Sequence, residues 1–307
     1  MNLLVTGASG LIGSALVATL GSEGHTVTRL VRAASAPEGA TIDVTWDPDR
    51  GQIDVAGLER AGPFDGVVHL AGAGIGDRRW SDGRKRVILE SRTESTRLLV
   101  DTLLRLSSRP PVLVSASAVG FYGDRGDEEL TESSSTGTGF LAEVCRTWEA
   151  SARPAADSGI RTVLLRTGIV LSRHGGAWGK QLPLFRVGAG GRMGSGRQYR
   201  SWITLDDEVG AILHCLSDAG LSGPVNATAP APATDAELAK TVGTVLHRPT
   251  VMVVPAVALK LVLGAEMAEE LVLGGQRVLP DVLTARGYHF AHPALDEAVR
   301  SVLTGRH

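Results

Sequence analysis

The sequence contains few aromatic residues, almost no cysteine and very little lysine. Of its 307 residues, 4% are aromatic, two are cysteine, and only four of the 31 basic residues are lysine. Two distant cysteines, Cys145 and Cys215, provide neither a disulfide framework nor a spaced metal-ligand motif, which favours a reducing, cytoplasmic compartment. The net charge of −2 lacks the basic excess of nucleic-acid-binding proteins, so we expect no nucleic-acid partner.

Long hydrophobic runs and metal-binding patterns are also missing. The most apolar stretch, residues 251–263, is interrupted by Pro255 and Lys260 and is too short to span a bilayer. The first residues have no basic segment before an apolar run and do not read as a signal peptide. No HExxH, CxxC or spaced acidic cluster occurs. We therefore expect no membrane partner and no metal.

Hydrophobic residues make up 43% of the chain, enough for a packed core. Short Val- and Leu-rich runs alternate with helical patterns through the first half of the sequence. Strands are expected at residues 3–5, 26–31, 41–46, 66–70, 112–114 and 161–165, and helices at 11–20, 81–106 and 140–158. Apolar strands that alternate with helices indicate a parallel sheet covered on both faces. The sequence thus predicts an α/β fold with a Rossmann-type doubly wound parallel sheet.

The composition changes after Ser172, which predicts a second domain. Residues 173–200 are rich in Gly, Arg and Gln, prolines interrupt residues 223–232, and the tail from Ala236 has mostly helical patterns. We expect a nucleotide-binding Rossmann domain over residues 1–172, to which residues 204–220 return. A smaller, mostly helical substrate-side domain is expected from residues 173–203 and 221–307.

A glycine motif over Thr6–Gly13 is the strongest local signal for function. It follows an apolar strand and opens a helix, the context that a dinucleotide-binding turn requires. Gly7 permits the tight turn, Gly10 lets the backbone approach a pyrophosphate, and Gly13 allows the helix to pack closely on the strand. An ordinary glycine-rich turn is the weaker alternative.

The second expected strand ends at Val31-Arg32. Folds that prefer NAD usually place an acidic residue there, to accept a hydrogen bond from the ribose 2′-hydroxyl. An arginine accommodates the 2′-phosphate of NADP instead, because its guanidinium is always charged and binds phosphate with two donors. Arg32 therefore favours NADP as the cofactor over NAD, although a surface arginine would look the same.

The glycine motif, together with Leu70-Ala71-Gly72, resembles the extended short-chain dehydrogenase/reductases of the NAD-dependent epimerase/dehydratase superfamily. Further segments narrow the resemblance to an atypical subfamily of NADP-dependent epimerase/oxidoreductases, some of which are also described as cell-division-inhibitor-like. The segments are residues 79–80, 90–93, 117–124, 148–149, 166–171, 194–198, 201–203 and 206–207. Residues 263–270 and 275–280 resemble that subfamily's own C-terminal domain of unknown function. The resemblance covers essentially the whole chain.

The resemblance implies a set of cofactor contacts. They are Gly7, Ser9, Gly10, Leu11, Ile12, Gly13 and Arg32, then Leu70, Ala71 and Gly72 beside the adenosine and pyrophosphate, Arg92 on the long helix, and Val170 near the nicotinamide end. The subfamily usually has histidine where this chain has Thr204, so no role is carried over to that position.

The catalytic pair of the superfamily is absent. Its working members use a tyrosine as acid/base, with a lysine four residues later that lowers its pKa. The residues four after Tyr122, Tyr199 and Tyr288 are Gly126, Ile203 and His292, and the helix that should carry the pair begins Phe140-Leu141-Ala142-Glu143-Val144-Cys145. Ser117, at the end of the fifth strand, and Tyr122 are the catalytic candidates left. A strand-end hydroxyl and a turn tyrosine are their structural alternatives.

The substrate side is expected near Arg197, Gln198 and Trp202, because the similar segment lines the cleft of nucleotide-sugar enzymes. Arg197 and Gln198 offer donors, and Trp202 offers a stacking face. A structured loop with Trp202 in the core is the equal alternative. Asn226 is expected either to contact the substrate or to form the hydrogen bonds of a turn. His69 is expected to be a core histidine. Glu132 is expected to be a solvated carboxylate, and Glu149 a partner on the surface of its helix.

Two functions remain open from the sequence. The first is an NADP(H)-binding oxidoreductase or epimerase-like protein acting on a small or nucleotide-linked carbonyl substrate. The second is a catalytically silent NADP(H)-binding sensor or scaffold, linked to cell division through the family description alone. The long helix carries several arginines and reads as solvated, so we expect a monomer or weak dimer whose partner is a small-molecule substrate.

Overall fold

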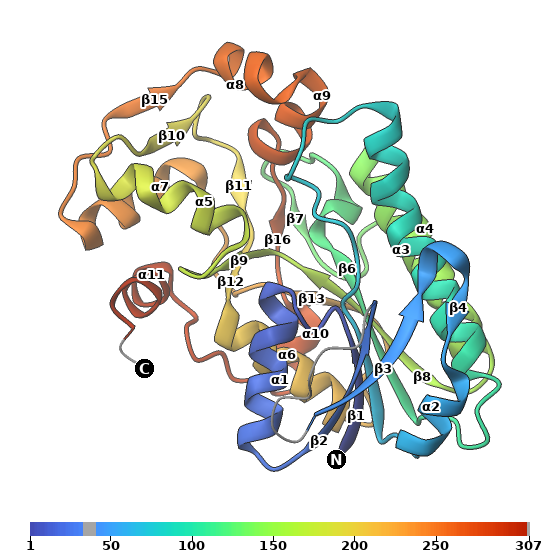
Figure 1. The fold of residues 1–307 in the computed structure, drawn as a ribbon. Coiled ribbons are helices and arrows are strands. Elements are labelled where there is room, and N and C mark those ends of the chain that lie inside the picture. The colour runs from blue at the N-terminus through green and yellow to red at the C-terminus, as the bar shows by residue number, and fades with distance from the viewer. Residues whose placement is uncertain (33–40, 306–307) are drawn as a thin grey trace.

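A computed structural model of the protein describes residues 1–32 and 41–305 (Figure 1). At its centre lies an eight-stranded sheet with the order β13-β8-β6-β5-β1-β2-β3-β4. All neighbouring strands pair in parallel except β3 and β4, which are antiparallel. The strands are β1 (Asn2–Thr6), β2 (Thr26–Val31), β3 (Thr41–Asp47), β4 (Gln52–Ile53), β5 (Gly66–His69), β6 (Val112–Ala118), β8 (Arg161–Thr167) and β13 (Gly223–Ala227). The order turns back at β1, so the predicted doubly wound α/β sheet is confirmed.

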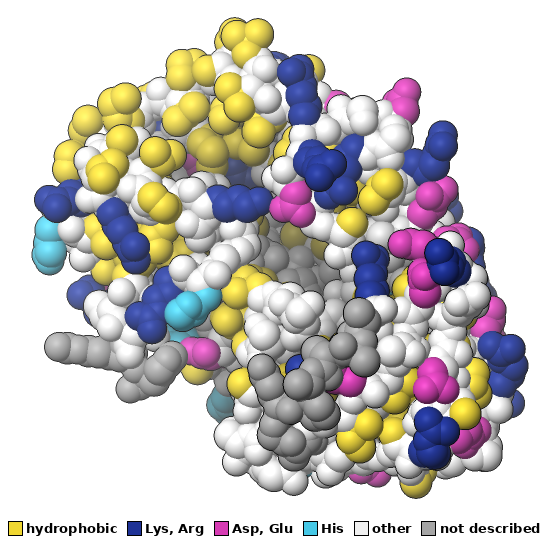
Figure 2. Space-filling model, viewed as in Figure 1, with side chains coloured by type: hydrophobic (Ala, Val, Ile, Leu, Met, Phe, Trp, Pro, Cys, Tyr) yellow, Lys and Arg dark blue, Asp and Glu magenta, His cyan; other side chains and the backbone are white. Residues whose placement is uncertain are grey.

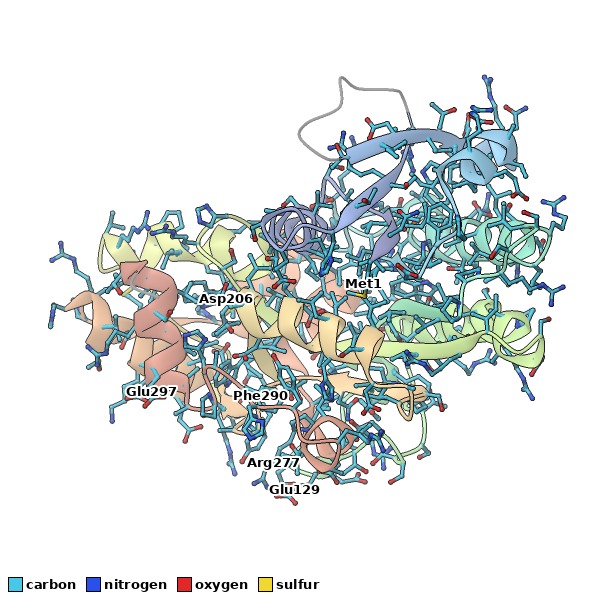
Figure 3. The ribbon with its side chains drawn as sticks, turned by 90° about the horizontal axis from the view of Figure 1, so that it is seen from below. Met1, Glu129, Asp206, Arg277, Phe290 and Glu297 are labelled. Carbon is cyan, nitrogen blue, oxygen red and sulfur yellow. The ribbon has the colours of Figure 1, made fainter. Side chains whose placement is uncertain are left out.

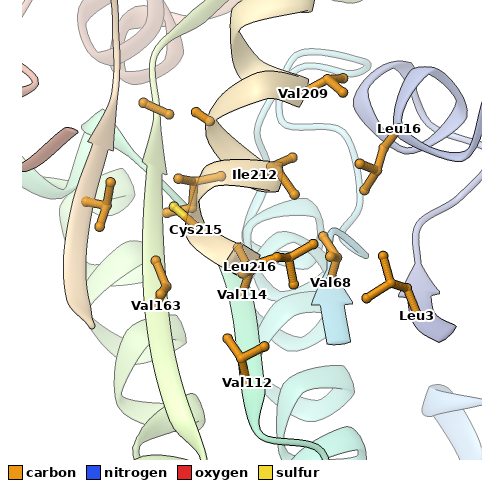
Figure 4. Packing of buried hydrophobic residues seen from close by; sticks show 14 of the residues in the cluster. Leu3, Leu16, Val68, Val112, Val114, Val163, Val209, Ile212, Cys215 and Leu216 are labelled. Carbon is orange, nitrogen blue, oxygen red and sulfur yellow. The ribbon is translucent and has the colours of Figure 1, made fainter. Parts of the chain in front are cut away.

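The sheet is covered on both faces. Successive residues of a strand point to opposite faces, so Leu3 and Val5 of β1 enter one core and Leu4 enters the other. The first core lies against α1 (Leu11–Ser22) and α6 (Leu205–Ser217), as Figure 4 shows. The second lies against α2 (Val55–Ala61), α3 (Asp82–Leu103) and α4 (Phe140–Asp157). Burial on both faces explains why apolar residues stand at successive positions in β1, β5, β6 and β8.

The link between β3 and β5 contains structure that the sequence analysis does not predict. A 3₁₀ turn over Pro48–Arg50 leads into β4, and α2 follows, with the Asp54 side chain accepting from Gly57 N at 2.8 Å. A helix of seven residues is too short to show a clear periodicity, although Asp54 is a recognisable N-cap.

Gly223–Ala227, which the sequence analysis groups with the second domain, is an edge strand of the central sheet. It pairs with β8 from Gly223↔Val163 to Ala227↔Thr167. Pro224 conceals the strand from pattern reading, yet an edge strand tolerates proline because one side of its backbone has no partner strand.

The remaining elements form a smaller, mostly helical part around a third core that includes Trp178 and Trp202. The glycine-rich segment after Ser172 is not only loop: it contains α5, whose Trp178, Leu182 and Phe185 are buried. The helices of this core are α5 (Gly176–Arg186), α7 (Asp235–Leu246) and α11 (Leu295–Thr304); α8 (Ala256–Leu263) and α9 (Ala265–Ala268) lie beyond it, and α10 (Asp281–Ala285) packs on the first core through Leu283. Four two-stranded ribbons join β10 (Gly191–Met193) to β15 (Met252–Val254), β11 (Tyr199–Arg200) to β14 (Ala233–Thr234), β12 (Trp202–Thr204) to β9 (Ile169–Leu171), and β16 (Arg277–Val278) to β7 (Glu129–Leu130).

The ribbon of β16 and β7 attaches the C-terminal tail to the sheet half of the molecule. Arg277 and Glu129 form an ion pair at 3.0 Å and lie next to each other in Figure 3. Leu130 and Val278 are buried beneath it, against Val119 and Tyr122. Among the helices of residues 1–32 and 41–305, none is both long and apolar enough to cross a membrane.

Candidate functional site: a glycine turn and an adjoining cavity

The glycine turn has the geometry that a nucleotide phosphate needs. Gly7 has a φ of +68°, and a Cβ there would lie 2.7 Å from the carbonyl oxygen of Leu70. A Cβ at Gly13 would lie 2.2 Å from the carbonyl oxygen of Gly7. Both positions therefore exclude any side chain. Only glycine lets β1, the turn and β5 come this close.

The N-terminus of α1 keeps its hydrogen-bond donors free. Its N-cap is Gly10, no side chain caps it, and its first turn contains no acidic residue. A free helix N-terminus combines N–H donors with the positive end of the helix dipole and suits an anion. Ser9 is exposed at the turn, and Arg32 is exposed directly after β2, at the same edge of the sheet.

Other cofactor positions implied by the resemblance lie at this edge too. The backbone N–H groups of Leu70 and Ala71 donate to Thr6 Oγ1 at 3.1 and 3.2 Å. A Cβ on Gly72 would lie 3.2 Å from Arg92 Cζ, so that guanidinium lies directly against the chain after β5.

Leu11, Ile12 and Val170 extend the same edge toward the second part of the molecule. A Cβ on Gly176 would lie 3.2 Å from Leu11 Cδ2 and 3.9 Å from the Val170 carbonyl oxygen. Ile12 and Val170 both pack against the first core. The structure thus brings together the positions named from the glycine motif and the resemblance.

A cavity of about 180 Å³ adjoins this edge. It lies where β6 and β8 end, between helices α3 and α4 and the C-terminal tail. Its lining includes Ile75 and Arg92, Ala118–Gly120, Leu141, Val144, Cys145 and Trp148 of α4, Thr167–Ile169, Tyr199–Ser201, and Glu270, Leu271, Gly274 and Gln276 of the tail. Ligands of open α/β folds bind at this position, outside the carboxyl ends of the strands.

Leu141 and Cys145 lie one helical turn apart on α4 and both line the cavity. They occupy the helix in which the superfamily carries its tyrosine and lysine. Burial raises the pKa of the Cys145 thiol to about 12, so the group is neutral at physiological pH. Neither residue can perform the proton transfer of the missing pair.

Arg92 is the cation that faces the cavity from α3. Its Nη1 donates to the carbonyl oxygens of Ala73 and Ile88 at 2.9 and 3.0 Å, and its guanidinium carbon lies 5.1 Å from the Trp148 ring centre. Burial lowers the pKa of Arg92, but guanidinium groups stay protonated in proteins. Fixed in this way, Arg92 presents a permanent positive charge to the cavity.

Glu270 closes the cavity from the C-terminal tail. Its two carboxylate oxygens accept from Phe140 N and Leu141 N at 2.8 Å each, and thereby cap the N-terminus of α4. The preceding Gly139 has a φ of +105° and provides no capping side chain. Arg200, buried and paired with Asp235 at 3.1 Å, donates to the Gly274 carbonyl and holds the tail in place.

The two catalytic candidates of the sequence analysis do not line the cavity. Ser117 is 4% exposed, and its Oγ donates to Glu149 Oε1 at 2.7 Å. Tyr122 is fully buried, donates to Asn226 Oδ1 at 2.7 Å and accepts from Arg166 at 2.9 Å. Burial raises the pKa of Tyr122. Both hydroxyls are satisfied inside the protein, which matches their structural alternatives.

The predicted substrate residues are engaged elsewhere. Trp202 is fully buried, and its Nε1 donates to the Ala231 carbonyl at 2.9 Å, so its ring presents no stacking face. Gln198 donates to the carbonyls of Met193 and Val272, and Arg197 is exposed outside the cavity lining. Asn226 satisfies no turn: it lies in β13 and donates to the Leu279 carbonyl.

His69, Glu149 and Glu132 all make contacts inside the protein. His69 is fully buried between Thr6 and Thr96, as expected of a core histidine, and burial lowers its pKa to about 4. Glu149 is not a surface partner but forms a buried pair with Arg166. Glu132 is not solvated: it accepts from the backbone of Asn226 and Val282, and burial raises its pKa. No group of three metal-ligating side chains occurs among the described residues.

Most of the cavity lining could not be predicted from the sequence. Glu270 and Gln276 lie in the tail segments that carry the family resemblance, but their sequence context does not reveal which surface they face. Glu270 contacts the start of α4, and the Gln276 carbonyl accepts from Ser201 between β11 and β12, so both contacts join residues more than 70 positions apart. Of the lining, the sequence indicates Arg92, through the family resemblance, and Leu141 and Cys145, which stand in the helix where Tyr-x-x-x-Lys is absent.

The fold and the glycine turn are those of the dinucleotide-binding Rossmann class. Residues 3–227 match the NAD dependent epimerase/dehydratase family, and residues 254–302 match a domain of unknown function, DUF1731. The chain belongs to the NAD dependent epimerase/dehydratase family, and both parts of the sequence resemblance are confirmed.

Relatives match over the full length of the chain. An epimerase family protein of Mycobacterium tuberculosis is 44% identical over 295 residues, which cover 96% of this chain and 95% of that protein. The crystal structure of human epimerase family protein SDR39U1 (isoform 2) with NADPH matches with a TM-score of 0.87 at 34% identity, covering 98% of this chain and 99% of that one. A nucleoside-diphosphate sugar epimerase from Corynebacterium glutamicum matches with a TM-score of 0.77 at 36% identity, covering 98% of this chain and 57% of that longer one.

Proposed function

We propose that this chain binds NADP(H) along the carboxyl edge of its sheet and acts as an oxidoreductase or epimerase-like enzyme on a small carbonyl compound. The observation that carries the proposal is the position of Arg92. This residue lies against Gly72 at the cofactor edge and also lines the cavity. Arg92 would therefore contact both a cofactor at the edge and a substrate in the cavity.

The residues at the edge fit NADP(H). Gly7 and Gly13 leave space that any Cβ would fill, and the start of α1 offers free N–H donors to a pyrophosphate. Arg32 is available to a 2′-phosphate. The human relative was solved with NADPH. When bound, this cofactor supplies hydride transfer at its nicotinamide ring.

The chain's own residues suggest how the missing pair is replaced. Arg92 can stabilise negative charge that develops on a substrate oxygen, because its guanidinium is held in place and keeps its proton. It cannot donate that proton, so another group has to act as the acid. Tyr199 is the only tyrosine in the cavity lining and is our candidate for this role.

The substrate is proposed to be small rather than nucleotide-linked. Drug-sized ligands occupy pockets of about 300–1,000 Å³, and this cavity has about 180 Å³. The groups that would bind a nucleotide, Gln198 and Trp202, already bond to backbone carbonyls of the protein. A single carbonyl compound of a few carbon atoms fits the space that is left.

A catalytically silent NADP(H)-binding sensor or scaffold is the second candidate. It is favoured by Leu141 and Cys145 at the cavity wall and by the internal bonds of Ser117 and Tyr122. Under this alternative the cavity would still bind a ligand, but no proton transfer would follow.

Purified protein should be screened with NADPH against small aldehydes and ketones, read as loss of nicotinamide absorbance, and with NADP⁺ against UDP-glucose, whose oxidation is read as gain of that absorbance. The proposal is supported by turnover of a small carbonyl compound that both Arg92→Gln and Tyr199→Phe reduce. Tyr199→Phe should keep its NADPH affinity within about twofold of wild type. Tight NADPH binding without turnover of any compound favours the silent protein. Turnover of UDP-glucose alone contradicts the small substrate.

A further inference from the structure

An exposed apolar surface covers one side of the smaller part of the molecule. It consists of Leu184, Val187, Val251, Met252, Val253, Val257, Leu261 and Val262, whose exposed fractions run from 42% to 83%. We call these eight residues the apolar face. No residue of α8 is fully buried, and its Val257, Leu261 and Val262 are exposed. In Figure 2, hydrophobic side chains gather over the region where Figure 1 draws α5, β15 and α8, with Lys and Arg beside them.

Three chain segments are joined in this surface. β10 pairs with β15 in parallel, with Arg192 opposite Val253. Arg248 Nε donates to the Arg186 carbonyl at 3.0 Å, which places the end of α5 beside the chain that enters β15. Contiguous apolar surface of this kind marks an interaction site, since single exposed apolar residues are otherwise scattered.

The two chain segments that carry the apolar face contain basic residues and no acidic ones, although acidic residues of other segments neutralise some of them: Lys180 pairs with Asp77, and Arg200 is buried against Asp235. Residues 173–205 contain the basic residues Arg173, Lys180, Arg186, Arg192, Arg197 and Arg200 and no Asp or Glu. Residues 238–265 contain Lys240, Arg248 and Lys260 and again no Asp or Glu. The whole chain has a net charge of −2, so positive charge is concentrated here.

Three arginines next to the apolar face have no acidic partner among the described residues, although Arg192 and Arg248 donate to backbone carbonyls. Lys260 of α8 pairs with Glu269. Arg186, Arg192 and Arg248, in contrast, form no ion pair with any residue that the structure describes. Their guanidinium groups therefore have no carboxylate to compete with an external ligand.

We propose that the apolar face docks on the surface of an anionic lipid membrane. Val257, Leu261 and Val262 enter the boundary between headgroups and acyl chains, and Arg186 and Arg248 bind lipid phosphates. A second copy of this chain fits less well, because a symmetric contact would bring the same unpaired arginines against each other. The missing long hydrophobic run excludes a spanning helix but not this surface, which only the folded chain assembles.

Vesicle flotation tests the proposal with the full-length protein. The probes are vesicles of phosphatidylcholine alone and vesicles of equal parts phosphatidylcholine and phosphatidylglycerol. Wild type should float with the anionic vesicles only, and less so at high salt. Val257→Ser combined with Leu261→Ser should abolish flotation. Arg186→Gln combined with Arg248→Gln should weaken it about tenfold or more, since each basic residue near an anionic surface contributes roughly a fivefold gain in affinity.

Matched variants outside the apolar face serve as controls. Val87→Ser, at a valine 47% exposed on α3, and Arg97→Gln should float like wild type. Circular dichroism establishes that every variant is folded. Failure of wild type to bind anionic vesicles overturns the proposal, and so does equal loss in the control variants. A different result would assign the apolar face to a second copy of the chain. In that case the wild type does not bind vesicles, light scattering shows a dimer, and Leu261→Ser converts it to a monomer.

Discussion

Arg166 and Glu149 form a two-pronged ion pair inside the molecule, with N–O distances of 2.8 and 2.9 Å. The same carboxylate accepts from Ser117, and the same guanidinium donates to Tyr122. The network joins β6, α4 and β8, with the Tyr122 hydroxyl at its far end bonded to Asn226. Two hydroxyls that the sequence analysis considers for catalysis are thereby parts of one internal scaffold.

Tyr122→Phe should therefore lower stability rather than activity. The substitution leaves Asn226 Oδ1 and one Arg166 donor unpaired in the interior, which costs about 1–3 kcal/mol in the free energy of unfolding. Urea unfolding measures this cost, and NADPH titration should show an unchanged affinity. Tyr199→Phe is the matched variant, with stability near wild type. A Tyr122→Phe protein of wild-type stability would contradict the scaffold role.

Arg32→Asp should weaken NADPH binding at least about tenfold and affect NADH much less. The change removes the guanidinium that can bind a 2′-phosphate and places a carboxylate there, which repels it. Fluorescence titration with both nucleotides measures the ratio. Arg86→Asp, at an exposed position on α3, is the control for net charge. Equal NADPH affinity in Arg32→Asp and wild type would assign Arg32 to the surface alone.

Gly13→Ala and Gly21→Ala should have opposite effects although both lie in α1. A methyl group at Gly13 collides with the glycine turn, 2.2 Å from the Gly7 oxygen, so we expect loss of NADPH binding and about 1–3 kcal/mol lower stability. A Cβ at Gly21 would meet no atom within 4 Å beyond its own helix backbone and chain neighbours, and alanine should stabilise the helix by about 0.5–1 kcal/mol. Thermal unfolding and nucleotide titration of both variants provide the comparison.

Glu270→Ala should destabilise the start of α4 and open the cavity wall. It leaves Phe140 N and Leu141 N without their acceptors, and losing a helix cap costs about 0.5–2 kcal/mol. The neighbouring Glu269→Ala removes only an exposed pair with Lys260 and should change stability by less than about 1 kcal/mol. Hydrogen exchange at the first turn of α4 should rise in the former variant alone. Equal exchange in both would show that Glu270 is not the cap.

Glu208 should make stability depend on pH. This carboxyl is fully buried, accepts from Thr167 at 2.8 Å, and burial raises its pKa from about 4.5 to about 8. The folded state therefore keeps a proton that the unfolded state releases above pH 4.5, so the contribution of Glu208 to stability is complete below that value. It declines as the pH rises toward 8 and is lost above it.

Glu208→Gln should remove this dependence. It keeps an oxygen acceptor for Thr167 without a titrating proton, so the variant should be roughly 1–3 kcal/mol more stable than wild type near pH 9. The difference should disappear in acid. Urea unfolding across the pH range measures it, and parallel curves for both proteins would place the titration elsewhere.

The succession of strands and helices in the sheet half could be predicted because it rests on local patterns. β1, β5 and β8 contain short continuous apolar runs, and α1, α3 and α4 have recognisable periodicity or position. Elements of two or three residues, and β13 with its internal proline, lack such a signal. The pairing of these short strands depends on which strand the tertiary fold places next to them, as it places β8 next to β13.

By itself, the sequence determined the parallel sheet, the cofactor turn and the absence of the superfamily's tyrosine–lysine pair. These features depend on residues within a few positions of each other, such as Gly7 and Gly13, whose backbone geometry admits no side chain. Only the tertiary structure decided which side chains face the cavity and where positive charge meets apolar surface. Glu270 reaches Phe140 across 130 residues, and Arg248 reaches Arg186 across 62. Contacts at such separations are set by how helices and sheets pack, and local periodicity carries no record of that packing.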